Sequence, residues 1–280
     1  MISFKALYKK FRRHPTVPLG AAALVLLVLM AIAAPHLSSF DPQDLDPLAR
    51  MNPASEDHLF GTDALGRDLW SRTVWGARVS LIVSASVAFL SIVFGVSIGM
   101  LAGYFRRIDS VVMRLMDGLM AIPGVLLAIA LMATMRASLT TVVIAIVIPE
   151  IPRVVRLVRA LVLTIREQPY VEAAVAVGTR VPQILLRHIL PNLFAPVMVQ
   201  ATFIAASAVL TEAVLSFLGV GIPPQIPSWG NMMAEGRNYI AVAFHIILYP
   251  GLFLAVTVLA INMLGDGLLD MLDPRLARKL

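Results

Sequence analysis

The sequence predicts an all-α polytopic membrane protein in which about six transmembrane helices form one transmembrane domain. Hydrophobic residues make up 59% of the 280 residues and charged residues only 14%, a balance more apolar than that of ordinary soluble domains. Three long runs, residues 79–105, 118–135 and 238–265, contain no Asp, Glu, Lys or Arg. About 20 apolar residues cross a hydrocarbon core of about 30 Å, so each run is of membrane-spanning length or close to it.

The first helix follows a basic stretch, and its apolar run contains Ala31-Ile32-Ala33, a combination that also occurs in cleavable signal peptides. Its apolar run is longer than a usual signal core, so we expect an uncleaved first helix. The expected spans are residues 17–36, 79–104, 114–135, 138–158, 194–217 and 244–266. They divide the chain into an N-terminal tail (1–16), a first transmembrane helix (17–36), an external segment (37–78), a transmembrane domain (79–270) with a polar loop (159–193), and a C-terminal tail (271–280).

The orientation follows from the distribution of basic residues. With the N-terminus inside, 17 of the 23 Lys and Arg residues fall in cytoplasmic segments. The positive-inside rule therefore places both termini and the loop 159–193 in the cytoplasm. The net charge of +6 is explained by this bias beside anionic headgroups, and we expect no nucleic-acid partner.

The external segment is acidic and proline-rich, and is too polar to enter lipid. Within it, Gly61 and Gly66 have the spacing of a phosphate-binding loop, but Arg67 and Asp68 replace the Lys and the Ser or Thr of that motif. Because Asp68 would repel a phosphate, we expect a structural turn here and no nucleotide site.

The polar loop begins with a predicted helix. Residues 172–177 read Glu-Ala-Ala-Val-Ala-Val, a helix-forming stretch whose small side chains allow another surface to approach closely. Gly178 then suits a turn with positive φ.

A second short helix is expected after this turn. Pro182 is acceptable in its first turn, and Ile184, Leu185 and His188 follow at helical spacing. We expect Pro191 to end this helix before the next span.

The loop resembles the EAA loop of importer-type ATP-binding-cassette (ABC) permeases, which is the surface that such a permease presents to its ATPase. The resemblance rests on Glu172, Ala173 and Ala174, then Gly178, then the pair Leu190-Pro191 at their spacing. One departure is His188, which stands where the general pattern has Ile.

Other segments are similar to the dipeptide, oligopeptide and nickel branch of these permeases. Each is short, but their order and intervals make the resemblance specific. The segments are residues 60–72, 76–81, 152–156, 215–221, 228–230, 264–266 and 273–275.

The resemblance implies the type I importer permease fold and a bacterial inner-membrane location. It further implies a heterodimer with a second, similar permease, two cytoplasmic ATPase subunits that bind ATP and magnesium, and an extracytoplasmic solute-binding protein. This chain would be non-catalytic, hold no cofactor itself, form half of the path, and transmit ATPase closure through the loop from Glu172 to Pro191.

The solute remains open within this reading. Peptides lead, followed by nickel chelates, opines, glycosidic solutes and antimicrobial peptides. An ATP-independent channel or a membrane-embedded enzyme is an alternative of another class, but it would leave the polar loop without a purpose.

The second span carries glycine at every fourth position, at Gly95, Gly99 and Gly103, so these residues form one stripe along the helix. A stripe of small residues lets helices pack closely in lipid. We favour static packing within one subunit over a moving or intersubunit contact.

Ionisable side chains occur close to the predicted span ends, where water can solvate them, and an intramembrane charge is otherwise a functional candidate. We favour the boundary interpretation, but Glu212 and His245 are candidates for a translocation path, with Arg237 and Asn238 at its outer mouth. The ionisable residues are Asp117, Glu150, Glu212, His245 and Asp266.

The sequence contains no pattern for hydrolysis or metal binding. It has no His-Glu-x-x-His pair and no Gly-x-Ser-x-Gly elbow, and its five histidines are scattered. The absence of cysteine excludes disulfides and a thiol nucleophile. We therefore expect neither a catalytic nor a metal site.

Overall fold

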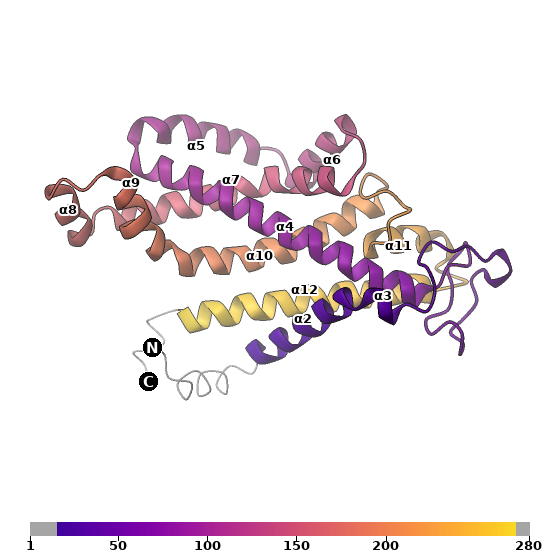
Figure 1. Cartoon of the computed structure of the whole chain (residues 1–280). Helices are drawn as coiled ribbons and strands as arrows, with labels where there is room; N and C mark the ends of the chain where they lie inside the picture. The colour runs from indigo at the N-terminus through magenta and orange to yellow at the C-terminus, as the bar shows by residue number, and fades with distance from the viewer. Residues whose placement is uncertain (1–15, 273–280) are drawn as a thin grey trace.

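The computed structural model describes residues 16–272, and the predicted tails lie almost wholly outside them. Long helices run side by side along an elongated molecule (Figure 1). Across the described residues there is no β-strand, only the isolated bridge between Thr62 and Asp68. The predicted all-α class is confirmed. The helices are α2 (Thr16–Ile32), α3 (Ala34–Leu37), α4 (Leu69–Tyr104), α5 (Arg106–Met120), α6 (Gly124–Thr134), α7 (Leu139–Ile165), α8 (Pro169–Ala176), α9 (Val181–Gln183), α10 (Leu190–Phe217), α11 (Trp229–Gly236) and α12 (His245–Leu272), with a π-helical segment η2 (Ile184–Ile189) and 3-10 turns η1 (Pro47–Ala49) and η3 (Arg237–Tyr239).

The span count depends on how broken and polar helices are treated. Three described helices, Leu69–Tyr104, Val181–Phe217 and His245–Asp270, are long and apolar enough to cross a membrane. The α5–α6 pair makes a fourth if its two parts count as one span. Six is reached by adding α2, which has 17 apolar residues, and α7, whose second half carries charged side chains.

The predicted span 114–135 is not one continuous helix. The structure has α5 and α6 in its place, bent by 88° at the break between them (Figure 1). Pro123 explains the break, because it has no N–H to donate and disfavours a helical conformation in Ile122. Helix α5 is amphipathic, and Met116 is its one fully buried residue.

The second span begins about ten residues earlier than expected. The Asp68 carboxylate caps α4 by accepting a hydrogen bond of 2.7 Å from the Ser71 amide. The resulting 36-residue helix is about 54 Å long, well beyond the hydrocarbon thickness. The first turns of α4 therefore belong to the predicted external layer. Helix α7 also extends past its predicted end, to Ile165.

The glycine stripe packs against α7 of the same chain. A Cβ at Gly99 would lie 2.8 Å from the Val158 Cβ, and one at Gly103 would lie 2.7 Å from the Val162 Cβ. Val154 occupies the corresponding place beside Gly95. The stripe thus brings α4 and α7 into close contact within one subunit, as the static interpretation supposes.

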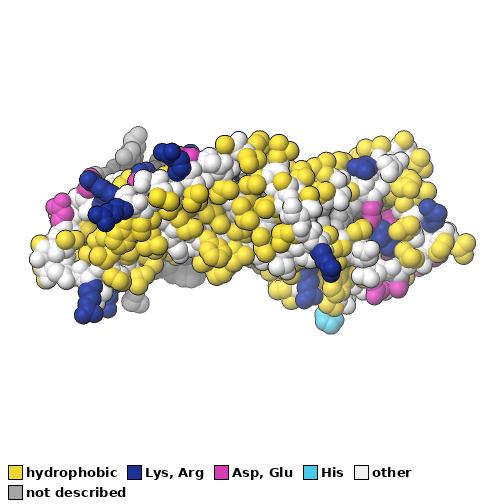
Figure 2. All heavy atoms as spheres, turned by 90° about the horizontal axis from the view of Figure 1, so that it is seen from above, with side chains coloured by type: hydrophobic (Ala, Val, Ile, Leu, Met, Phe, Trp, Pro, Cys, Tyr) yellow, Lys and Arg dark blue, Asp and Glu magenta, His cyan; other side chains and the backbone are white. Residues whose placement is uncertain are grey.

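The main core lies between α4, α6, α7 and α10, and a second core joins α2 and α12 to α4 and α10 around buried Trp229. One face of the molecule is mostly hydrophobic along its middle, with charged side chains gathered toward the ends (Figure 2). The α8–α9 region lies at one end of the molecule, toward which the start of α2 and the end of α12 point, and the external segment lies at the other end (Figure 1). This arrangement agrees with a multi-pass membrane protein.

Candidate functional site

The first half of the polar loop folds as a helix followed by a glycine turn. Helix α8 covers residues Glu172 to Ala174, and Gly178 follows it with φ of 82°. The Gly178 amide donates to the Val175 carbonyl at 2.9 Å, and the Thr179 amide donates to the Ala174 carbonyl at 3.0 Å. This pair of bonds is the Schellman motif, which ends helices at glycine.

The outer face of α8 is exposed at the end of the molecule. Val175 and Val177 are 54% and 86% exposed, and Glu172 and Ala173 are also exposed. Within residues 16–272, the Glu172 carboxylate has no ion-pair partner. The face combines apolar groups with an unpaired carboxylate, a composition suited to contact with another protein.

The second half of the loop does not end where the sequence suggested. Pro182 lies in the first turn of α9 as expected. The chain then passes through η2 directly into α10, so Pro191 does not terminate a helix. Pro191 sits in the first turn of α10, where a missing N–H removes no hydrogen bond internal to that helix.

Segment η2 anchors the loop to the core. Ile184, Leu185 and Ile189 are buried. The Asn192 side chain donates to the His188 carbonyl at 2.7 Å and to the Tyr170 hydroxyl at 3.2 Å, which ties α8 to the start of α10. The His188 Nδ1 is buried without a hydrogen-bond partner.

Two arginines connect the loop end of α7 to its neighbours. The Arg166 guanidinium donates to the Gly103 carbonyl at the end of α4, at 3.0 Å. Arg159 makes two hydrogen bonds to the Asp109 carboxylate of α5, one of them 2.6 Å long. A displacement of the loop would therefore act on α4 and α5 through α7 and on α10 through η2.

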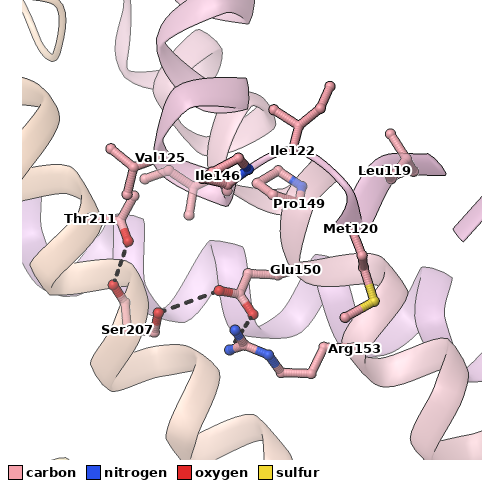
Figure 3. Close-up of a pocket in the computed structure, with 12 residues that line it drawn as sticks. Leu119, Met120, Ile122, Val125, Ile146, Pro149, Glu150, Arg153, Ser207 and Thr211 are labelled. Carbon is pink, nitrogen blue, oxygen red and sulfur yellow. Dashed lines mark hydrogen bonds and ion pairs between the residues drawn. The ribbon is translucent and has the colours of Figure 1, made fainter. Parts of the chain in front are cut away.

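A cavity of about 290 Å³ lies at the bend between α5 and α6 (Figure 3). Glu150 of α7 projects into it and is only 8% exposed. Its carboxylate accepts hydrogen bonds from Arg153 at 3.0 Å and from the Ser207 hydroxyl of α10 at 3.3 Å. The Thr211 hydroxyl donates to the Ser207 carbonyl at 2.9 Å. The sequence placed Glu150 near the solvated end of its span, whereas the structure buries this residue and continues α7 for 15 residues beyond it.

The predicted path residues do not gather at this cavity. Glu212 is fully buried and accepts hydrogen bonds from Ser216 at 2.8 Å and Ser80 at 3.5 Å. His245 Nε2 lies 3.2 Å from the Thr62 carbonyl oxygen. Arg237 stacks over the Phe217 ring at 5.7 Å. Glu212 is thus enclosed within the chain, and His245 and Arg237 lie toward the external segment.

The segment around Gly61 and Gly66, which has the spacing of a phosphate-binding loop, folds as a structural turn, as expected. The Asp63 carboxylate accepts hydrogen bonds from the amides of Leu65 and Arg67. The Arg67 guanidinium lies 2.6 Å from both Asp63 and Glu235, and Arg72 lies 3.1 Å from Glu235. Burial raises the pKa of Glu235, while the two guanidinium charges oppose the rise. This cluster joins the external segment to α11.

Comparison with known proteins identifies the family. Residues 91–278 match the model for the "Binding-protein-dependent transport system inner membrane component". The chain belongs to this family. Residues 4–54 also match the "N-terminal TM domain of oligopeptide transport permease C". The predicted ABC importer permease family is therefore confirmed, and the type I permease fold with it.

Similarity to other permeases covers almost the whole chain. A probable peptide ABC transporter permease of Sinorhizobium fredii is 54% identical over 96% of this chain and 92% of that protein. A dipeptide transport system permease of Alkalihalophilus pseudofirmus is 40% identical over 96% of this chain and 89% of that protein. An oligopeptide transport system permease of Bacillus subtilis is 37% identical over 96% and 88%, respectively.

Within this permease, the loop and the cavity are the two candidate sites. The EAA-like residues Glu172, Ala173, Ala174 and Gly178 lie together on α8 and its turn, at one end of the molecule, whereas Leu190 and Pro191 begin α10. Sequence reasoning missed the grouping of Glu150 with Ser207. The one available signal was a carboxylate between two prolines in an apolar run, since Pro149 and Pro152 flank it on α7.

Proposed function

We propose that this chain is one of two permease subunits of an ATP-driven importer of peptides in a bacterial inner membrane. The peptide substrate is supported by the similar proteins, which are named as peptide, dipeptide and oligopeptide permeases. The cytoplasmic placement of the loop and both termini is supported by the charge bias.

The exposed face of α8 is the observation that carries the coupling role. Two cytoplasmic ATPase subunits would bind ATP and magnesium, and one of them would receive α8 and the Gly178 turn. An unpaired Glu172 beside exposed Val175 offers both a charge and an apolar contact to that subunit. This chain contributes the path and the mechanical linkage, and the energy comes from ATP.

The linkage would work through packed helices. ATPase closure would displace the loop, and buried η2 would carry the displacement into α10 while Arg159 and Arg166 carry it through α7 to α5 and α4. The path would open outward to receive solute from an extracytoplasmic binding protein, and hydrolysis would restore the inward-facing state. A second, similar permease would complete the path.

The test is reconstitution of the complete transporter with its ATPases and binding protein in liposomes. We expect ATP-dependent uptake of a labelled tripeptide and copurification of the ATPase with this chain. Uptake at the same rate without ATP would favour an ATP-independent channel. If ATP-driven uptake occurs for a nickel chelate or an opine and not for peptides, the transporter class stands and the peptide assignment fails.

A further inference from the structure

The cavity at the α5–α6 bend joins two features that mark solute sites in transporters. Glu150 lies near the middle of the 27-residue helix α7, and its carboxylate is held in a side chain that is only 10% exposed. Such a charge is costly, and within membrane proteins it commonly marks a solute or ion pathway. The neighbouring span is discontinuous, bent by 88° between α5 and α6, and discontinuous helices form many transporter binding sites.

The hydrogen-bond pattern shows what kind of group the cavity suits. The hydroxyl hydrogen of Ser207 is used on Glu150, and that of Thr211 is used on the Ser207 carbonyl. Both hydroxyl oxygens therefore offer only lone pairs to a ligand. The Glu150 carboxylate is likewise an acceptor. Three acceptors, one of them negatively charged, suit a donor with several N–H groups and a positive charge.

Arg153 does not remove this capacity. Its side chain is 54% exposed, which leaves the guanidinium room to turn away from Glu150. The Glu150 side chain is only 10% exposed and has no such alternative. An exposed partner contributes little to an ion pair, so an incoming cation can replace Arg153 at the carboxylate.

We propose that this cavity binds the primary ammonium group of the transported solute, with Glu150 as its counter-ion and Ser207 and Thr211 as additional acceptors. The inference rests on the proposed peptide import, in which the group is the free amino terminus. Apolar residues on the rest of the cavity wall, including Ile122, Val125 and Ile146, would contact the first side chain (Figure 3). At about 290 Å³ the cavity holds one end of a peptide, and the second permease would enclose the remainder.

The test uses the complete transporter with the other subunits in cysteine-free form. This chain contains no native cysteine, and Ile122 at the cavity is 46% exposed. Ile122→Cys therefore places a single accessible reporter at the cavity. The rate of its modification by N-ethylmaleimide is measured against increasing trialanine. We expect trialanine to protect the reporter, and N-acetyl-trialanine, which has no ammonium group, to give no protection.

Glu150→Gln should raise the concentration of trialanine needed for half protection by about tenfold or more, because it removes the counter-ion. Glu150→Asp should retain part of the protection, and Ser207→Ala should weaken it less than Glu150→Gln. Glu212→Gln is the matched control, since Glu212 is also a buried glutamate but lies outside the cavity. It should leave protection by trialanine unchanged.

Each result separates the two proposals. The ammonium site is wrong, and peptide import stands, if two results occur together. The wild-type complex takes up trialanine with ATP, and trialanine protects the reporter of the Glu150→Gln variant at the same concentration as that of the wild type. Equal protection by N-acetyl-trialanine would also overturn the site. If Glu150→Gln fails to assemble, Glu150→Asp and Ser207→Ala decide, and unchanged protection in both would reject it. Absence of any ATP-driven peptide uptake in wild type would instead reject the proposed function.

Discussion

At the scale of single residues, Gly178 is required by its backbone conformation and not by close packing. Its φ is 82°, and a Cβ placed there would meet nothing within 4 Å. A β-branched residue strongly disfavours this conformation, at a cost of about 1–2 kcal/mol or more. The turn places α8 and α9 relative to each other, so a change at Gly178 acts on the orientation of the proposed ATPase contact.

We expect Gly178→Val to reduce peptide-stimulated ATPase activity strongly while membrane abundance stays close to wild type. Gly178→Asn is the matched control, since Asn tolerates positive φ and should keep most of the stimulation. ATPase assays on the reconstituted complex, with quantitative blotting of the membranes, measure both quantities. Normal stimulation by the Val variant would show that the turn geometry does not matter for coupling.

Glu172 gives a second test at this scale. We expect Glu172→Lys to weaken retention of the ATPase more than Glu172→Gln, because Lys adds repulsion at an interface that water screens poorly. Loss of one partner of a buried charge pair costs on the order of 2–5 kcal/mol. A role confined to the dipole of α8 would be worth only about 0.3–1 kcal/mol. Pull-down in detergent across a salt series measures retention, and equal retention of all three forms at low salt would leave only the helix role.

At the scale of elements, the close contact between α4 and α7 depends on three glycines four residues apart. A Cβ at Gly99 would lie 2.8 Å from the Val158 Cβ and 3.0 Å from the Val155 carbonyl oxygen. The backbone oxygen cannot move without shifting α7, which also carries Glu150 and the start of the loop. The contact between these two helices thus positions both candidate sites.

We expect Gly99→Ala to destabilise the permease by about 1–3 kcal/mol, the usual cost of overpacking a core. The matched control is Gly118→Ala on α5, where a Cβ would meet nothing within 4 Å. That control should be neutral or slightly stabilising, because Ala favours a helix more than Gly does. The melting temperatures of the Gly99→Ala and Gly118→Ala variants are measured by size-exclusion chromatography after heating. Equal melting temperatures would show that the helices can separate without cost.

At the scale of the whole molecule, the structure places the α8–α9 region of the loop at one end and the external segment at the other (Figure 1). The ion-pair cluster of Asp63, Arg67, Arg72 and Glu235 joins that segment to α11. The α5–α6 cavity lies along α7, between the two ends.

A topology experiment uses the absence of native cysteine. Ala54→Cys and Ala176→Cys each replace an exposed residue, one in the external segment and one on α8. We expect an impermeant thiol reagent added to intact spheroplasts to modify the Ala54 variant and to leave the Ala176 variant unmodified until the membrane is opened. Labelling of the Ala176 variant in sealed spheroplasts would overturn the orientation deduced from charge bias.

Several features followed from the sequence because they depend on local chemistry. Apolar runs of membrane length predicted an all-α membrane protein, and one glycine after Glu-Ala-Ala-Val-Ala-Val predicted a positive-φ turn at Gly178. Residues 61–68 were not expected to bind a nucleotide, because Arg67 and Asp68 stand where a phosphate-binding loop has Lys and then Ser or Thr. The spacing of short motifs also indicated the permease family that the comparisons confirm.

Tertiary structure alone decided which distant residues meet. The sequence does not state that Glu150 contacts Ser207, 57 positions away, or that Glu212 is enclosed by Ser80 and Ser216. Nor does it show that the predicted span 114–135 is bent by 88° between α5 and α6. Hydropathy and periodicity describe one segment at a time, whereas the role of a carboxylate inside a membrane depends on the helices packed around it, which a sequence without its fold does not specify.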